Sequence, residues 1–329
     1  VRLELSIEAP GEDPLEVAEI LAKERIRIFE GRFDGAMEIL GPDSPGDTIE
    51  DQPWTVELDV SANDVELGIE GVEGASLIGS GGSASVYRAT QKALGREVAV
   101  KVLHVHFGAD DDAERRRFQR EQIALGTLSD LRGIVPLYES GLTATGRPFL
   151  IMPLYRSGSL QDLIERDGPL EWRAAVDLMV QAARAVQRAH DEGVLHRDLK
   201  PANLMVGRDG EVAVGDFGIA RLVGSTTLFQ SRALSTTPAF APPEVFANEE
   251  PTVAVDVYGL GSTLFALING SPAFVSVTGD LNVLALMRRV ETDPVPDLRE
   301  MGVPAAVAAV VDRSMEKRPS DRHASAEEW

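Results

Sequence analysis

The chain has 329 residues, which is long enough for two packed domains. It contains no cysteine, so disulfide frameworks, cysteine-ligated metal sites and cysteine nucleophiles are excluded. Its 53 acidic and 32 basic side chains give a net charge of −21. We therefore expect no nucleic-acid partner, because phosphate contacts need clustered Lys and Arg side chains.

The negative charge is concentrated at the start of the chain. Residues 1–75 carry 20 acidic and 5 basic side chains, a net charge of −15, whereas the remaining 254 residues carry 33 and 27, a net charge of −6. Alternating apolar and polar residues predict strands over 1–9 and 54–60, and an Asp-Pro start predicts a helix over 13–29. We expect residues 1–71 to form a small acidic α+β extension. Its role stays open between regulation or interaction, which we favour, and an inert cap.

The pattern then changes from strand-rich to helical. Short strands are expected at 77–78, 85–87 and 98–103, and a charged helix is expected at 113–128. After residue 152 the periodicity is mostly helical, with helices predicted over 160–165, 171–191, 256–268, 281–290 and 305–315. A strand-rich half followed by a larger helical half favours a two-lobed enzyme with its cleft between the lobes.

One stretch, 257–279, has no charged residue and is long enough to span a bilayer. Asn269, Gly270 and Pro272 interrupt it, and no basic cluster flanks it. We interpret it as a buried core helix, and we expect no membrane segment within these residues.

Two features of the strand-rich half could take part in binding or catalysis. Residues 79–86 form a Gly-rich turn whose backbone N–H groups could approach phosphate oxygens, although a plain hairpin turn fits equally well. Lys101 ends an apolar strand and needs an anionic partner, for which Glu121, 20 residues later, is the natural candidate. An exposed strand lysine is the alternative. His104 and His106 follow without a carboxylate or cysteine cluster, so packing or solvated roles are expected for them.

The strongest motif is His-Arg-Asp-Leu-Lys-Pro-Ala-Asn, which begins at residue 196. Asp198 can accept a hydroxyl proton, Lys200 can neutralise phosphate charge, and Asn203 can hold a metal through its amide oxygen. Pro201 is expected to keep this loop from being helical. Asp216, followed by Phe-Gly, comes 18 residues after Asp198 and supplies a second oxygen ligand. Two hard oxygen ligands suit Mg²⁺ that carries nucleotide phosphates.

With these motifs in this order, residues 76–329 resemble the eukaryotic-like (Hanks-type) Ser/Thr protein kinases of bacteria. The resemblance implies an α+β, two-lobed protein kinase fold, with a strand-rich N-lobe over 72–152 and a helical C-lobe over 153–329, preceded by the acidic extension. It also implies a protein serine/threonine kinase that transfers the γ-phosphate of ATP to hydroxyls of protein substrates. The implied cofactors are ATP and Mg²⁺, with Mn²⁺ as an alternative metal.

The same resemblance assigns roles to individual residues. Asp198 would be the catalytic base, assisted by Lys200 and by Lys101 paired with Glu121. Asn203 and Asp216 would bind the metal. The residues that would surround ATP are Ile78, Gly79, Gly81, Val86, Ala99, Lys101, Met152 as gatekeeper, Leu154 and Met205.

The resemblance also implies how the kinase is regulated and which residues stabilise its active site. Arg197 beside the catalytic Asp implies activation by a phosphorylated segment between Asp216 and Glu244, reached by autophosphorylation between transiently associated copies. The phosphosite candidates are Ser231, Thr226 and Thr227. The structural residues would be Arg197, Thr237 beside the catalytic Asp and Lys, Asp256 as the anchor of the catalytic loop, and Arg322 in a salt bridge with Glu244.

Departures from the family pattern do not remove a catalytic group. Ala84 replaces the third glycine of the loop, and Pro153 occupies the hinge. An active enzyme is therefore favoured over a silent kinase-fold scaffold acting through the acidic extension. A small-molecule kinase of the aminoglycoside or choline type is the third hypothesis, and Lys200 counts against it. We expect a cytoplasmic protein, with an anchor outside these residues left open.

Overall fold

The structure is a computed structural model. It describes residues 2–7, 37–40, 54–59, 65–81, 84–105, 107, 116, 118, 122–123, 125–217, 238–275 and 283–329. In the acidic extension it places three strands, β1 (Arg2–Ile7), β2 (Met37–Leu40) and β3 (Trp54–Asp59), in an antiparallel sheet with β3 in the centre. The two strands predicted here are confirmed, β2 was not predicted, and the predicted helix over 13–29 lies outside the described residues.

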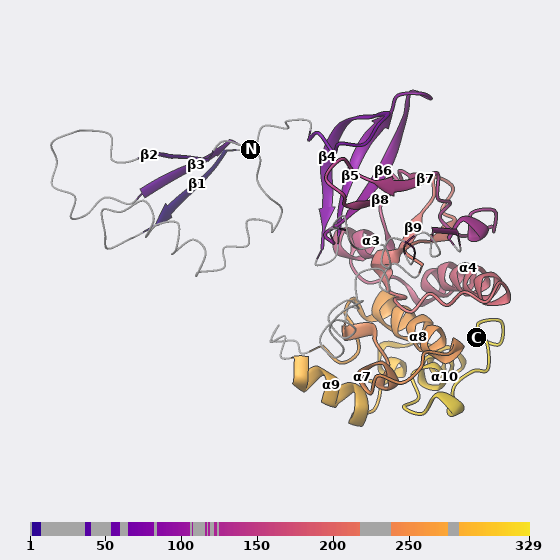
Figure 1. The fold of residues 1–329 in the computed structure, drawn as a ribbon. Coiled ribbons are helices and arrows are strands. Elements are labelled where there is room, and N and C mark those ends of the chain that lie inside the picture. Colours follow the sequence, from indigo (N-terminus) through magenta and orange to yellow (C-terminus); the bar gives the residue numbers. More distant parts are fainter. Residues whose placement is uncertain are drawn as a thin grey trace.

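A second, five-stranded antiparallel sheet forms the N-lobe, in the order β4-β5-β6-β8-β7 (Figure 1). Its strands are β4 (Val72–Ser80), β5 (Ala84–Gln91), β6 (Arg96–Leu103), β7 (Glu139–Leu142) and β8 (Pro148–Pro153). The three strands predicted for this half are confirmed as parts of β4, β5 and β6. The structure therefore bears out the strand-rich half, and it adds the β7–β8 hairpin, which the sequence analysis did not predict.

The register of this sheet gathers residues that are far apart in sequence. Gly79 lies opposite Val86, Val86 lies opposite Lys101, and Ala99 lies opposite Met152. Directly opposed residues share a face of a sheet, and so do residues two apart on one strand, such as Ala99 and Lys101. Five of the predicted nucleotide-binding residues thus lie on one face.

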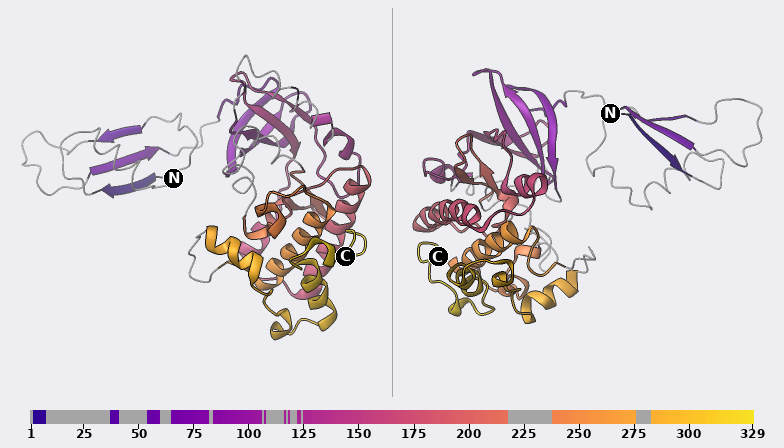
Figure 2. Two further views of the ribbon diagram at one scale, coloured as in Figure 1. Left: turned by 60° about the horizontal axis from the view of Figure 1, so that its bottom comes forward. Right: turned by 180° about the vertical axis from the view of Figure 1, so that it is seen from behind.

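The other half is helical and lies below the N-lobe sheet in Figure 1 and in both views of Figure 2. Every helix predicted for it is confirmed, with ends shifted by three residues or fewer. The helices are α3 (Leu160–Asp167), α4 (Trp172–Asp191), α7 (Pro243–Phe246), α8 (Val253–Asn269), α9 (Val283–Thr292) and α10 (Ala305–Ser314). The chain thus has the predicted two-lobed α+β fold.

Helix α8 is the core of the helical lobe. Thr252 caps its first turn, accepting a hydrogen bond from the backbone N–H of Ala254, and Gly270 ends it with a left-handed φ of 83°. All residues from 254 to 268 are buried, which confirms the core-helix interpretation for residues 257–268 of the uncharged stretch; the helix ends at Asn269. Helix α10 packs so closely on it that a Cβ added at Gly261 would lie 2.4 Å from that of Ser314. Among the described residues, no helix combines the length and apolar character needed to cross a membrane.

Candidate active site

The catalytic-loop motif lies between α4 and a short hairpin, β9 (Leu204–Val206) and β10 (Val212–Val214). Residues Pro201–Asn203 form a single 3₁₀ turn, so the expectation that Pro201 excludes helical structure was wrong. Proline at the first position of a helical turn gives up an N–H that would have no partner there. The turn brings the Asn203 side chain within hydrogen-bond distance of Asp198.

Within this loop, two polar side chains converge on one carboxylate oxygen of Asp198. The Lys200 ammonium lies 2.8 Å from Asp198 Oδ2. Asn203 Nδ2 donates to the same oxygen at 3.2 Å and to the backbone carbonyl of Asp198 at 2.8 Å. Only 14% of the Asp198 side chain and 18% of the Lys200 side chain are exposed, so the pair sits at the bottom of a partly desolvated site. The Asp198 carboxylate is therefore fixed in position and retains a second oxygen for a substrate.

The N-lobe contributes one charge to this site. The Lys101 ammonium lies 2.6 Å from Asp216 Oδ2, with 11% and 26% of the two side chains exposed. The sequence predicted Glu121 as its partner; Glu121 lies outside the described residues, and the anion that the structure places on Lys101 is Asp216. Asp216 has a left-handed φ of 62°, which is uncommon for a residue other than glycine.

The Lys101–Asp216 pair also sets the ionisation of the site. Burial by itself would raise the pKa of Asp216, but the charge and the hydrogen bond of Lys101 outweigh burial and hold the pKa below its ordinary value. Asp216 is therefore an anion at neutral pH, available to a metal or to Lys101. The hydrogen bond from the backbone N–H of Gly215 to the carbonyl of Asn203, 2.8 Å, joins this aspartate to the catalytic loop.

Asp256, on α8, holds the loop from below. Its carboxylate accepts hydrogen bonds from the backbone N–H of His196 at 2.8 Å and of Arg197 at 2.6 Å. His190 Nε2 lies 2.7 Å from the same carboxylate. Arg197 has a left-handed φ of 69°, so a strained backbone is held by a carboxylate that is 1% exposed. The resemblance implied Asp256 as an anchor; His190 had no assigned role.

His196 is fully buried and both of its ring nitrogens are engaged. Nε2 lies 2.7 Å from the carbonyl oxygen of Gly215, which can only accept, and Nδ1 accepts from the backbone N–H of Asp198 at 3.2 Å. These two contacts together require the hydrogen on Nε2. The ring packs on Phe217, with centroids 4.7 Å apart. His196 therefore links the catalytic loop to the segment of Asp216 and has no nitrogen left to act as a base.

A buried ion pair supports the segment that follows. Arg322 donates to both carboxylate oxygens of Glu244, at 2.5 and 2.8 Å, and 3% and 7% of the two residues are exposed. The same guanidinium donates to the backbone carbonyls of Ala254 on α8, at 2.9 Å, and Glu316, at 2.8 Å. Bidentate geometry with the remaining donors satisfied is the condition under which a buried pair is stable.

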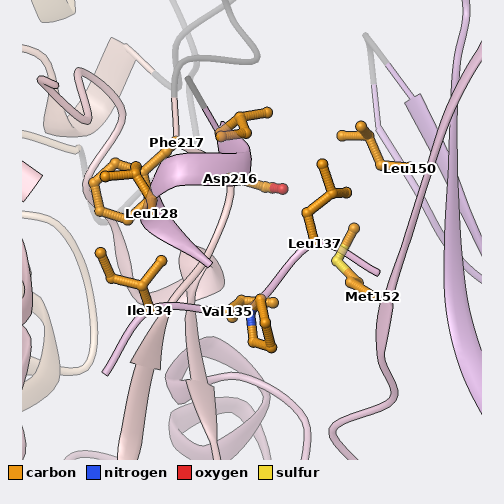
Figure 3. Close-up of a pocket in the computed structure, with 10 residues that line it drawn as sticks. Leu128, Ile134, Val135, Leu137, Leu150, Met152, Asp216 and Phe217 are labelled. Carbon is orange, nitrogen blue, oxygen red and sulfur yellow. The ribbon is translucent and has the colours of Figure 1, made fainter. Parts of the chain in front are cut away.

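An apolar pocket opens behind Met152, between the two lobes (Figure 3). Asp216 points into it and is the one ionisable side chain among its described lining residues. The others are Leu125, Leu128, Ile134, Val135, Pro136, Leu137, Leu150, Met152 and Phe217. Apolar surroundings on this side lower the local dielectric, which strengthens the Lys101–Asp216 attraction.

Comparison with known proteins agrees with this geometry. Residues 72–329 match the family described as the protein kinase domain. The chain belongs to the protein kinase family. The resemblance drawn from the catalytic motifs is thereby confirmed.

Named relatives lie among bacterial kinases. The kinase domain is similar to the serine/threonine-protein kinase PknK of Mycobacterium bovis, with 43% identity over 267 residues, which is 81% of this chain and 23% of the relative. It is also similar to the serine/threonine-protein kinase PknB of Mycobacterium leprae, with 34% identity over 257 residues, 77% of this chain and 40% of the relative. The chain thus spans less than half the length of either relative.

Several predicted site residues sit apart from these contacts or outside the described chain. Ile78 is 52% exposed at the rim of the Gly-rich turn, and Leu154 and Met205 are half-buried. The kinase residues for which the structure gives no description are Glu121, Thr226, Thr227, Ser231 and Thr237.

Proposed function

We propose that this kinase domain is a Mg²⁺/ATP-dependent protein serine/threonine kinase that transfers the γ-phosphoryl group of ATP to Ser or Thr hydroxyls of proteins. The observation that carries the proposal is that the site contains two charged pairs, each of an aspartate and a lysine. Asp198 and Lys200 form one pair on the catalytic loop, and Lys101 of the N-lobe forms the other with Asp216. Phosphoryl transfer needs little covalent chemistry from the protein and depends on positioning and on charge neutralisation.

In this proposal Asp198 orients the acceptor hydroxyl and takes its proton on a carboxylate oxygen. The contacts of Lys200 and Asn203 to Oδ2 fix the carboxylate, so that the proton acceptor has one orientation. Lys200 can then neutralise charge on the transferred phosphoryl group. Lys101 would release Asp216 when ATP enters, and would bind its phosphates instead.

The donor set fits a magnesium ion. Asn203 uses its Nδ2 for two hydrogen bonds to Asp198, which leaves the amide oxygen for a cation, and Asp216 is an ionised carboxylate. Mg²⁺ is usually held by one or two carboxylates together with substrate phosphates and water. When bound, the ion would neutralise the phosphates of ATP. Mn²⁺ would fit the same oxygen donors.

The remaining parts of the proposal concern regulation. We infer that phosphorylation of Ser231, Thr226 or Thr227 activates the kinase, through contacts of the phosphate with Arg197. Phosphorylation in trans requires transient association of two copies. We place the reaction in the cytoplasm because it consumes ATP, and we assign residues 1–71 a regulatory or interaction role on account of their acidity.

The test is incorporation of labelled phosphate from ATP by the purified chain, with Asp198→Asn as the matched control. The wild-type chain is expected to label itself or a generic protein acceptor in the presence of Mg²⁺, and the variant is expected to lose at least about 100-fold in rate, as for removal of a general base. Metal removal with a chelator should stop labelling, and added Mg²⁺ should restore it.

Phosphosite mapping then separates the parts of the proposal. Phosphate on Thr226, Thr227 or Ser231, absent from Asp198→Asn, would support autoactivation. If the wild-type chain binds ATP and transfers no phosphate under any metal condition, the kinase proposal fails and the scaffold hypothesis replaces it. Deletion of residues 1–71 in the same assay would show whether the extension restrains or supports activity.

A further inference from the structure

Two described glycines of the Gly-rich turn, Gly79 and Gly81, have open space on their Cβ side. A Cβ added at Gly79 or Gly81 would meet no atom within 4 Å, and the backbone bond from Gly81 N–H to the carbonyl of Ala84, 2.9 Å, closes the turn. Glycines without packed side chains leave backbone freedom, so polar bonds that hold the two arms of the turn matter for its position.

Such bonds are present on one side of the sheet. The Ser85 hydroxyl lies 3.3 Å from the Ser80 hydroxyl, across the turn, and 2.9 Å from His104 Nε2. Ser80 ends β4, Ser85 lies at the start of β5, and His104 directly follows β6. The three side chains, which we name the serine–histidine relay, therefore tie both arms of the turn to the strand that carries Lys101.

The relay does not face the nucleotide side. Val86 and Lys101 are directly opposed and share one face of the sheet. Side chains alternate between faces along a strand, so Ser85, one residue before Val86, points to the other face, where it is opposed by Val102. Ser85 is only 4% exposed, and a buried hydroxyl requires the partners that His104 and Ser80 supply.

We propose that His104 and Ser85 are positioning residues for ATP, acting through the height and rigidity of the Gly-rich turn. This inference depends on the proposed function only in taking that turn as the cover of the ATP phosphates. The relay joins the turn to the end of β6, three residues after Lys101, so the two phosphate-binding elements move as one unit. Loss of the relay leaves the turn mobile, and ATP binding must then order it.

The experiment measures ATP affinity and steady-state kinetics on the full chain. His104→Leu and Ser85→Ala are each expected to weaken ATP binding, and to raise KM for ATP, by about 2- to 10-fold, the range for one hydrogen bond, while kcat changes less. His104→Gln keeps a polar nitrogen or oxygen near the position of Nε2 and is expected to restore most of the affinity. The Ser85→Ala, His104→Leu double variant should lose little more than either single variant, because both remove the same bond.

Thr143→Val is the matched control. Thr143 is a buried N-lobe hydroxyl, 6% exposed, which accepts from the backbone N–H of Arg147 at 3.1 Å in the connection between β7 and β8. It should lower thermal stability without changing ATP affinity. The inference is overturned if His104→Leu leaves ATP affinity unchanged, if its effect is no larger than that of Thr143→Val, or if the losses in the double variant add. Calorimetric ATP binding does not require phosphoryl transfer, so it tests the relay even if the kinase proposal fails.

Discussion

Removal of the Arg322 guanidinium is predicted to destabilise the C-lobe strongly. Replacing Arg322 by Met keeps much of the aliphatic volume but removes every donor. Glu244, which is 7% exposed, would then lose both hydrogen bonds from its cationic partner, and the carbonyls of Ala254 and Glu316 would lose their donor. Glu244 and Ala254 are both 7% exposed, so solvent cannot replace the contacts that these two residues lose.

The magnitude follows from burial. Breaking a buried ion pair by removing one partner costs about 3–5 kcal/mol of unfolding free energy. The exposed pair between Arg313 and Glu328, 3.1 Å apart with 50% and 42% of the side chains exposed, provides the comparison. Its loss in Arg313→Met should cost about 0–1 kcal/mol, because water replaces the lost partner. For a lobe of this size the buried change corresponds to a fall in Tm of roughly 6–20 °C.

Urea and thermal unfolding followed by circular dichroism would measure both variants against the wild-type chain. The expected order is wild type, then Arg313→Met close to it, then Arg322→Met well below. Equal losses in the two variants would refute the reasoning, because burial is the main difference between the two pairs. A loss smaller than about 1 kcal/mol in Arg322→Met would do the same.

Three further predictions concern the active site. Asp256→Asn removes one of the two anionic oxygens that accept loop N–H groups, so kcat should fall about 10-fold or more, with a loss of about 1–3 kcal/mol in urea unfolding. Lys101→Met removes the cation that lowers the pKa of Asp216, so the pKa of Asp216 should rise. The carboxylate would then become protonated at a higher pH than in the wild-type chain. The acid limb of metal-dependent ATP binding should therefore shift to higher pH. Gly259→Ala would place a Cβ 2.8 Å from that of Leu199, the residue after Asp198. This clash should lower kcat and reduce the free energy of unfolding by about 1–3 kcal/mol, which a lowered Tm would report.

Each of these has an outcome that would contradict it. Full activity in Asp256→Asn would show that the loop keeps its geometry without the carboxylate. An unchanged acid limb in Lys101→Met would show that Asp216 does not control metal-dependent binding. Wild-type kcat in Gly259→Ala, alongside a lowered Tm, would show that α8 can shift without moving the catalytic loop.

The sequence predicts the catalytic loop well because its chemistry is local. Asp198, Lys200 and Asn203 lie within six residues, so one turn is enough to bring their side chains together, and the structure shows the contacts among them. Helix α8 could be predicted for a related reason. Its burial requires a long run of uncharged residues, which begins at residue 257 within the helix, and Thr252 and Gly270 cap its two ends.

Contacts between segments that are far apart in the chain could not be predicted from the sequence in this way. The partner of Lys101 is 115 residues away, and the choice between two acidic side chains depends on how the lobes meet. The strands β9 and β10 have three residues each, too few to show alternation. The serine–histidine relay has no sequence signal either, since Ser85 and His104 become neighbours only through the register of β5 on β6.

Helix α8 connects the two supports of the site. Asp256 holds the backbone at Arg197, and the carbonyl of Ala254, two residues earlier, accepts from the guanidinium that binds Glu244. The backbone next to Asp198 and the ion pair of Glu244 are thus fixed to the same turn of one buried helix. A phosphate that contacted Arg197 would therefore act on a backbone that Asp256 already anchors, so it would not have to move Asp198.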